Sequence, residues 1–320
     1  MGSDAIALPL LDWLAGEGSA VATVVGVFTQ PDRPVGRGQK VTANAIKTWA
    51  LDRSLPVYQP EKLTEDVRVQ LAALNADVAL VMAYGHILRD EFINTPRLGT
   101  LNLHTSLLPK YRGASPIQTA IANGESHTGV TLMRIVRKLD AGPVADSEGV
   151  TIGPAETALE IEAKLAAACV PLVARSLPRL RDGALGFTPQ DETAVTFCRK
   201  LNKEDGVLDF SASATVLAAR INGLFPWPAC SVEFGGQPVK FGAAVADSSA
   251  HGPAGEVLGA DAEALRIGTG QGVLRVLRLQ RPGGRMLPAA EFLRGLPVAP
   301  GTGLVSRPMP TLVADAPFRS

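Results

Sequence analysis

The sequence is poor in cysteine, and its few cysteines are badly placed for cross-linking or for metal binding. The chain of 320 residues contains three of them, Cys169, Cys198 and Cys230. An odd number of widely spaced cysteines makes neither a disulfide framework nor a zinc site. We therefore expect a protein of a reducing compartment.

Long apolar runs and a targeting leader are also missing. No stretch of about 18 apolar residues occurs, which excludes a transmembrane helix. The N-terminal region has no basic leader before an apolar stretch, and Pro9 and Asp12 interrupt the apolar residues 5–14. We expect a soluble, cytoplasmic protein without a membrane partner.

The chain carries no net charge, because 31 Lys and Arg balance 31 Asp and Glu. This balance excludes a protein whose whole surface attracts nucleic acid or an acidic membrane, although a local basic patch remains possible. The sequence also lacks a phosphate-binding P-loop and a GxGxxG motif after its first apparent strand. With 46% hydrophobic residues, the chain can bury large cores, and its length favours two domains.

Apolar runs and helical patterns alternate in the first half. Strands are expected at residues 20–28, 77–84, 100–104, 130–135 and 144–152, and helices at 43–53, 63–74, 86–93 and 117–122. This alternation predicts an α/β fold with a Rossmann-like, doubly wound, mainly parallel sheet. Residues 156–181 are also helical, and Pro171 and Pro178 predict a break near Val170. Ligands of such sheets lie beyond the carboxyl ends of the strands.

The second half has a different texture. One helix is expected at residues 212–223 and a short one at 288–293, with short strands at 231–234, 239–244, 255–258, 264–267 and 273–279. Many short strands with glycine-rich turns, such as Gly235-Gly236, predict a smaller C-terminal OB-like β-barrel. We divide the chain into a first domain at 1–183, a linker at 184–202, a barrel domain at 203–308 and a loosely ordered tail at 309–320.

The densest group of polar residues lies in segment 101–113 (LNLHTSLLPKYRG). Asn102 and His104 are two positions apart on an expected strand, so their side chains share a face. An amide beside an imidazole can bind a carbonyl oxygen and move a proton, as acyl transfer requires. An isolated Asn-x-His is more often structural, with Asn capping a loop and His satisfied internally.

A carboxylate for this pair could come from Asp140, which follows the expected strand 130–135. If that strand neighbours 100–104, Asp140 reaches the same rim of the sheet and could orient His104 or accept a proton. A turn Asp before Ala-Gly would explain the residue equally well.

Two basic segments could contact nucleic acid. Arg33, Arg37 and Lys40 face a single nearby acid, Asp32, in the loop 31–40, and could clamp a phosphate backbone. Four arginines follow one another in the barrel half, at positions 275, 278, 281 and 285. A solvated loop and a solvated charged face explain these segments as well.

Seven segments together resemble the methionyl-tRNA formyltransferases, within the folate-dependent formyltransferase family. They are 29–40 (TQPDRPVGRGQK), 59–63 (QPEKL), 83–85 (AYG), 102–113 (NLHTSLLPKYRG), 139–142 (LDAG), 203–206 (KEDG) and 226–228 (PWP). The resemblance runs from Gly2 to about Gly301. The HxSLLP core is shared among folate-dependent formyltransferases, whereas the PDRPxGRG loop, KEDG and PWP are more specific.

The resemblance implies a transferase of protein biosynthesis and one-carbon metabolism. Such an enzyme moves the formyl group of 10-formyltetrahydrofolate to the α-amino group of methionine on initiator tRNA, for translation initiation. It needs no metal, and we expect it to act as a monomer. Its barrel domain would contribute to tRNA binding.

The implied site residues fall into three groups. Asn102, His104 and Asp140 would form the catalytic set. The folate site would be lined by Tyr84, Gly85, Ser106, Leu107, Leu108 and Pro109. The acceptor end of the tRNA would contact Arg33, Arg37 and Lys40.

The sequence departs from the family pattern in two places. Met1 lies where the family's first strand should be ending, so we expect neighbouring strands to lack ladder partners. We expect the chain to begin at an internal Met of a longer natural protein; the alternative is a compromised domain. In addition, residues 224–228 (LFPWP) replace the more usual Asn-Pro-Trp-Pro.

Two other functions remain open. A different folate-dependent formyltransferase could act on a nucleotide sugar or a purine precursor, but the Arg37 loop and the barrel argue against it. A non-catalytic RNA-binding protein with a decayed formyltransferase half is the other alternative. The joint presence of Asn102, His104 and Asp140 argues against decay.

Overall fold

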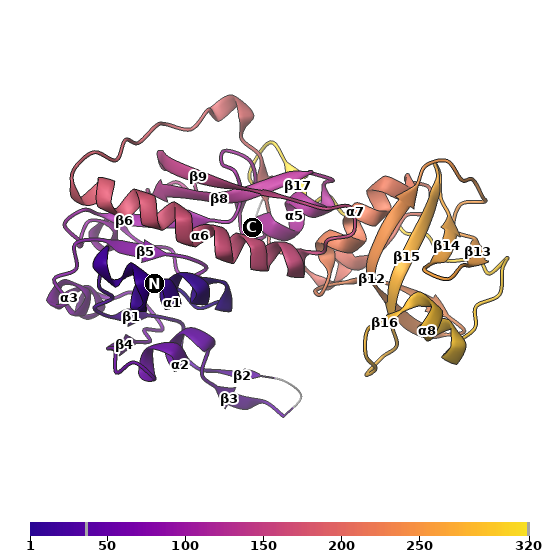
Figure 1. Ribbon diagram of the computed structural model, residues 1–320, viewed down its shortest axis with the longest axis horizontal. Coiled ribbons are helices and arrows are strands. Elements are labelled where there is room, and N and C mark those ends of the chain that lie inside the picture. Colours follow the sequence, from indigo (N-terminus) through magenta and orange to yellow (C-terminus); the bar gives the residue numbers. More distant parts are fainter. Residues whose placement is uncertain (36–37, 319–320) are drawn as a thin grey trace. The chain divides into compact units, whose positions relative to one another are not determined.

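The structure, a computed structural model, describes residues 1–35 and 38–318. The chain forms two units, which Figure 1 traces from indigo to yellow. The first unit comprises residues 1–112, 129–150 and 163–195, and the second comprises 113–128, 151–162 and 196–320. The domain boundaries given above stay a prediction, since the chain passes between the units several times.

The first unit is an α/β structure built on short strands. β1 (Val27–Phe28) runs parallel to β4 (Val57–Tyr58), and β5 (Ala79–Val81) runs parallel to β6 (Thr100–His104). The predicted Rossmann-like class is confirmed by these parallel pairs. The sheet continues through β8 (His127–Arg134), which is antiparallel to β6, to β9 (Val144–Thr151).

Helices surround these strands, and a hairpin of β2 (Arg33–Val35) and β3 (Lys40–Thr42) extends from the unit (Figure 1). The helices are α1 (Leu8–Ala15), α2 (Ala45–Leu51), α3 (Glu65–Ala73), α4 (Asp90–Ile93) and α6 (Ala158–Arg181), with 3-10 turns at Ala5–Ala7, Glu17–Ala20 and Glu192–Ala194. None of the helices in the described ranges combines the length and apolarity needed to cross a membrane.

Strands β1 and β5 are shorter than the sequence predicts, because little backbone lies between them. The N–H of Gly2 donates to the carbonyl of Phe28 at 3.0 Å, and the N–H of Met82 donates to the carbonyl of Met1 at 3.0 Å. Beyond this contact, residues 20–28 and residues 74–82 both line an apolar groove of about 500 Å³. Extended backbone without a ladder partner does not form a regular strand.

Helix α6 runs without a break through Pro171 and Pro178, so the predicted interruption near Val170 is wrong. Each internal proline removes one helical hydrogen bond and costs about 3 kcal/mol. The helix offsets this cost with a fully buried face that includes Leu165, Cys169 and Leu172. Tertiary packing of that face overrides the local preference.

The second unit centres on a curled antiparallel sheet of order β11-β12-β15-β14-β13, with β16 added beside β15. Its strands are β11 (Cys230–Phe234), β12 (Gln237–Asp247), β13 (Val257–Ala260), β14 (Leu265–Gly268), β15 (Val273–Gln280) and β16 (Leu287–Pro288). Gly235 and Gly236 have φ of 56° and 76° and form the two-residue hairpin turn predicted from their pattern. The OB-like barrel is realised as an open half-barrel, since the ladder path runs from β11 to β13 without closing among the described residues.

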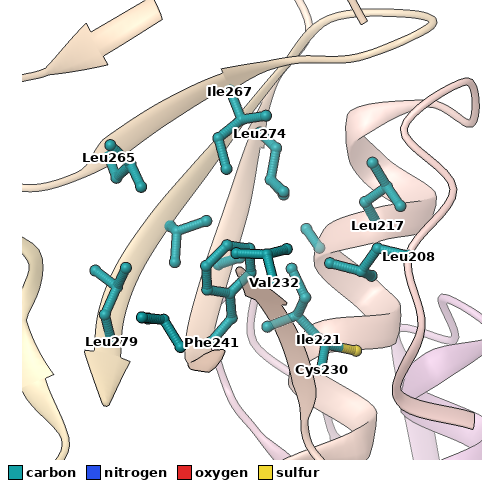
Figure 2. Packing of buried hydrophobic residues seen from close by; sticks show 14 of the residues in the cluster. Leu208, Leu217, Ile221, Cys230, Val232, Phe241, Leu265, Ile267, Leu274 and Leu279 are labelled. Carbon is teal, nitrogen blue, oxygen red and sulfur yellow. The ribbon is translucent and has the colours of Figure 1, made fainter. Parts of the chain in front are cut away.

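A helix packs against one face of this sheet. Figure 2 shows Leu217 and Ile221 of α7 (Ala214–Leu224) pointing toward Val232 and Phe241. These side chains are buried and give the unit its own hydrophobic core. The remaining elements are α5 (Pro116–Ala122), α8 (Ala289–Gly295), the 3-10 turn Lys203–Gly206, β7 (Arg112–Gly113), β10 (Phe197–Cys198) and β17 (Val313–Ala314).

Residues 310, 313 and 314 of the C-terminal tail make contacts within the second unit, and the loose order of the tail stays a prediction. The buried Arg220 donates from Nη2 to the carbonyl of Pro310 at 3.1 Å and to that of Asp205 at 2.9 Å. Strand β17 also pairs with β10. Residues 203–206 (KEDG) thus have a structural role, because Asp205 accepts two hydrogen bonds from Arg199.

Candidate active site

Asn102 and His104 lie on one face of β6, as the two-residue period requires. Leu101 and Leu103 point to the other face, where they are fully buried. His104 is 6% exposed, whereas Asn102 is half-buried. Within the described part of the chain, the Asn102 side chain makes no hydrogen bond, so its amide is available to a ligand.

Asp140 approaches His104 by a different route from the predicted one. Strand β8 is antiparallel to β6, and its end pairs with the beginning of β6, where the N–H of Ile135 donates to the carbonyl of Thr100. A shared carboxyl rim therefore cannot bring Asp140 to His104. The loop 135–143 turns back instead, and Oδ2 of Asp140 lies 3.9 Å from Nδ1 of His104.

The environment of His104 fixes which ring nitrogen carries a proton. Nε2 lies 3.0 Å from the carbonyl oxygen of Tyr111. A carbonyl can only accept, so Nε2 donates to it. Nδ1, the other ring nitrogen, faces Asp140. At 3.9 Å the two atoms are too far apart for a direct hydrogen bond.

The turn that presents Asp140 has a demanding backbone. Asp140 has a φ of 48°, a left-handed conformation that Asp tolerates better than most residues. A Cβ at Gly142 would lie 1.8 Å from the carbonyl oxygen of Arg134. The N–H of Arg134 donates to the carbonyl of Pro143 at 3.0 Å and closes the base of the loop. The LDAG segment is thus a tight turn that only glycine permits at its end.

Two residues that sequence reasoning missed hold this turn. Gln190 donates from Nε2 to the carbonyls of Asp140 and Gly142, each at 2.8 Å. Its Oε1 accepts from Nε and Nη2 of Arg112 at 3.0 and 2.8 Å. Arg112 is fully buried, and the sequence marks it only as part of the 101–113 segment. Gln190 lies in the predicted linker, where no local pattern marks it.

Glu192 supplies a counter-charge to the guanidinium of Arg112. Nη2 of Arg112 lies 2.8 Å from Oε1 of Glu192, and Nζ of Lys138 lies 2.8 Å from Oε2. These two hydrogen-bonded cations lower the pKa of Glu192 to about 2. Lys138 precedes Asp140 by two residues, so Glu192 holds the same loop at a second point.

Polar contacts of Asp32 hold the start of the basic hairpin, which is formed by β2 and β3. Asp32 accepts from Nε2 of Gln59 and from Nζ of Lys47, both at 2.7 Å. These hydrogen bonds lower the pKa of Asp32, with the contact from Gln59 contributing most. Arg33 and Lys40 are exposed on β2 and β3, opposite Thr42 and Val35 in the ladder. Arg37 lies outside the described residues.

The comparison with known families decides the kinship of this chain. The Formyl transferase family matches residues 4–175, and the family "Formyl transferase, C-terminal domain" matches residues 200–297. The chain belongs to the formyl transferase family. The members of this family are enzymes that transfer formyl groups. The resemblance predicted from the sequence is thus confirmed for the family.

Individual proteins agree with the family match. A methionyl-tRNA formyltransferase of Ralstonia nicotianae is 41% identical over 307 residues, which cover 92% of this chain and 94% of the relative. One from Sorangium cellulosum is 41% identical over 298 residues, covering 92% and 94%. The crystal structure of HypX from Aquifex aeolicus in complex with tetrahydrofolic acid has a TM-score of 0.56 at 22% identity, covering 80% of this chain and 47% of HypX. The last likeness is one of fold.

In this formyl transferase the SLLP segment forms a tied loop after β6. Oγ of Ser106 donates to the carbonyl of Lys110 at 2.7 Å, so the hydroxyl is used inside the loop. Oγ1 of Thr131 donates to the carbonyl of Ser106 at 2.7 Å and accepts from the N–H of Leu108 at 3.1 Å. Leu107, Leu108 and Pro109 are half-buried. A Cβ at Gly129 would meet Leu107 at 2.5 Å, so glycine lets the loop lie against β8.

The AYG segment of this formyl transferase divides between core and surface. Tyr84 is 2% exposed and packs in the core with Phe28 and Leu71. Burial raises the pKa of its hydroxyl to about 12. Gly85 has a φ of 79°, and the carbonyl of Tyr84 accepts from Nε2 of Gln30 at 3.2 Å. Any ligand contact at Tyr84 would therefore use its backbone.

Metal ligands are not grouped in the part of the chain that the structure describes. No three side chains of His, Cys, Asp or Glu there come close enough to hold an ion together.

Proposed function

We propose that this enzyme transfers the formyl group of 10-formyltetrahydrofolate to the α-amino group of methionine on initiator tRNA. The family match over both halves and the two relatives named methionyl-tRNA formyltransferase support it. The observation that carries the proposal is the approach of Asp140 to His104, at 3.9 Å. The amide of Asn102, which has no partner among the described residues, lies on the same face of β6 as His104. An amide, an imidazole and a carboxylate are the groups that this reaction needs.

Asn102 would act on the formyl oxygen. As the amine attacks the formyl carbon, that oxygen gains negative charge and needs a fixed donor. The amide of Asn102 has two N–H donors without a partner among the described residues. Loss of one such donor costs roughly 3–4 kcal/mol of transition-state stabilisation.

His104 and Asp140 would manage charge and the proton. The attacking amine must lose a proton, and the Asp140 carboxylate and Nδ1 of His104 are the two acceptors that face each other. Because Nε2 is committed to the carbonyl of Tyr111, any proton that reaches His104 arrives at Nδ1. A protonated imidazole beside the ionised carboxylate would then assist Asn102 with the negative oxygen.

The folate co-substrate supplies the formyl group. As the negative oxygen reforms the carbonyl, the bond between the formyl carbon and its folate nitrogen breaks, and that nitrogen takes up the proton that the amine gave to His104 or Asp140, which leaves tetrahydrofolate. We assign its site to the loop of Ser106, Leu107, Leu108 and Pro109, together with the backbone at Tyr84 and Gly85. The half-buried apolar side chains of the loop suit a flat ring, and the HypX structure with tetrahydrofolic acid lends support through the shared fold.

The initiator tRNA would meet the basic hairpin. Arg33 and Lys40 are exposed there, and exposed cations on a hairpin can neutralise phosphates of an acceptor stem. Arg37 is assigned to the same contact from the sequence. We further propose that the enzyme works in the cytoplasm as a monomer.

A substrate comparison tests this function. Purified enzyme with 10-formyltetrahydrofolate is given methionylated initiator tRNA, methionylated elongator tRNA, an amino sugar nucleotide or a purine-precursor amine. We expect formylation of the initiator tRNA alone at a useful rate. Preferential formylation of a small amine would establish the rival activity, and salt-dependent tRNA binding without turnover would indicate a decayed enzyme.

A further inference from the structure

His104 and Asp140 are joined by a circuit of contacts that runs through residues outside the predicted site. Nε2 of His104 donates to the carbonyl of Tyr111 at 3.0 Å. The next residue, Arg112, donates twice to Oε1 of Gln190, at 3.0 and 2.8 Å. Gln190 donates in turn to the carbonyl of Asp140 at 2.8 Å. The circuit closes where Asp140 faces His104 at 3.9 Å.

The amide of Gln190 can face only one way in this circuit. A guanidinium has donors alone, so the oxygen of the amide must lie toward Arg112. The nitrogen then lies toward two carbonyls, those of Asp140 and Gly142, each at 2.8 Å. Both N–H groups are used, one on each side of Ala141, and the turn is held at both ends by a single side chain.

The turn needs such a hold because its backbone is unfavourable. Asp140 has a φ of 48°, which a residue with a Cβ rarely adopts. A relaxation of this turn would swing the carboxylate, since the carboxylate is carried by the strained residue itself. Arg112 holds the Gln190 side chain in place, because the charge of Arg112 is fully buried and is matched by Glu192 at 2.8 Å.

We propose that Gln190 is a positioning residue, which sets the direction and distance of the Asp140 carboxylate relative to Nδ1 of His104. The proposal rests on the proposed formyl transfer, since it gives Gln190 a part in the same site. A displacement of about 1 Å in a catalytic group can cost about a hundredfold in rate. Gln190 donates to the backbone carbonyl of Asp140 and not to its carboxylate or to the imidazole of His104. Its effect on the reaction therefore passes through the position of Asp140.

Two substitutions distinguish the contact of Gln190 with Arg112 from its contacts with the carbonyls of Asp140 and Gly142. Gln190→Met keeps the length of the side chain and removes all its hydrogen bonds. Gln190→Glu keeps an acceptor for Arg112 but turns the donor to Asp140 and Gly142 into an acceptor. We expect both to lower kcat about tenfold to a hundredfold, with KM for folate and tRNA changed by less than about twofold.

A neighbouring substitution provides the matched control. Asp191→Asn alters the next residue of the same segment, whose carboxylate accepts from the N–H and the hydroxyl of Thr193. We expect its kcat to equal that of the wild type. Should Gln190→Met fail to fold, Gln190→Glu, which retains the Arg112 contact, carries the test.

A spectroscopic measurement distinguishes positioning from activity. The ¹⁵N resonances of the His104 imidazole are recorded in the free enzyme, without either substrate. We expect them to move in the Gln190 variants and to stay in place in Asp191→Asn, at similar melting temperatures. Wild-type kcat in a folded Gln190 variant, or an unchanged His104 resonance, overturns the positioning role. Failure of the wild type to formylate tRNA overturns the proposed function instead, and the resonance alone then decides the role of Gln190.

Discussion

Oδ2 of Asp140 lies 3.9 Å from Nδ1 of His104, although their strands, β8 and β6, run in opposite directions. The loop after β8 therefore has to fold back to bring the carboxylate to the imidazole. The proposed chemistry depends on this return, because neither group can manage the amine proton and the oxyanion alone.

The catalytic set is tested by three substitutions. We expect His104→Ala and Asp140→Asn to abolish formylation, and Asn102→Ala to lower kcat about a hundredfold to a thousandfold by removing an oxyanion donor. Steady-state formylation of initiator tRNA measures the loss, and circular dichroism confirms that each variant is folded. Near-wild-type kcat in any of the three would remove that residue from the catalytic set.

The loop geometry is tested by glycine substitutions. Gly142→Ala places a Cβ 1.8 Å from the carbonyl oxygen of Arg134, so we expect it to destabilise the fold by about 1–3 kcal/mol and to impair formylation. Gly149→Ala on β9 is the control, since nothing lies within 4 Å of its Cβ. Urea denaturation measures the free energy of unfolding of both variants. Equal stability of the two would contradict the tight turn.

The ion pairs of Glu192 predict an acid-dependent contribution to stability. Hydrogen bonds from Arg112 and Lys138 lower its pKa to about 2 from an ordinary value of 4.5. The folded state therefore binds this proton less readily, and the stabilisation is complete above pH 4.5 and is lost as the pH falls toward 2. We expect Glu192→Gln to be less stable than the wild type above pH 4.5, and the difference to shrink on acidification. A difference in urea midpoint that does not vary between pH 6 and pH 3 would refute this linkage.

The basic hairpin predicts a salt-dependent contact with tRNA. Replacing Arg33 and Lys40 with Ala should raise KM for tRNA and reduce the slope of log K against log salt by about two. KM for folate should stay unchanged. Lys62→Ala is the control, since Lys62 is an exposed cation outside the hairpin. An equal effect of the control would show that general charge, rather than the hairpin, attracts the tRNA.

The sequence predicts most elements, and it fails where tertiary contacts decide. The bounds of β6 and the glycine hairpin turn follow from local pattern. The unbroken α6 does not, because its buried face outweighs two prolines. The short β1 and β5 depend on a neighbouring backbone that local pattern does not report.

The site shows the same division. The shared face of Asn102 and His104 follows from the two-residue period alone. The catalytic role of Asp140 rests on the family resemblance alone. Because β8 is antiparallel to β6, the two strands do not share the carboxyl edge from which Asp140 was expected to reach His104. Gln190 could not be predicted, since its partners lie 48 to 78 positions away and a glutamine in an irregular segment has no local signature.

The most direct measurement is single-turnover formylation of methionylated initiator tRNA by excess purified enzyme with 10-formyltetrahydrofolate. We expect the wild type to convert the bound tRNA to formylmethionyl-tRNA and Asp140→Asn to bind it equally well without conversion. No conversion by the wild type, with both substrates bound, would contradict the proposed function. Equal conversion by Asp140→Asn would contradict the role of the His104–Asp140 pair.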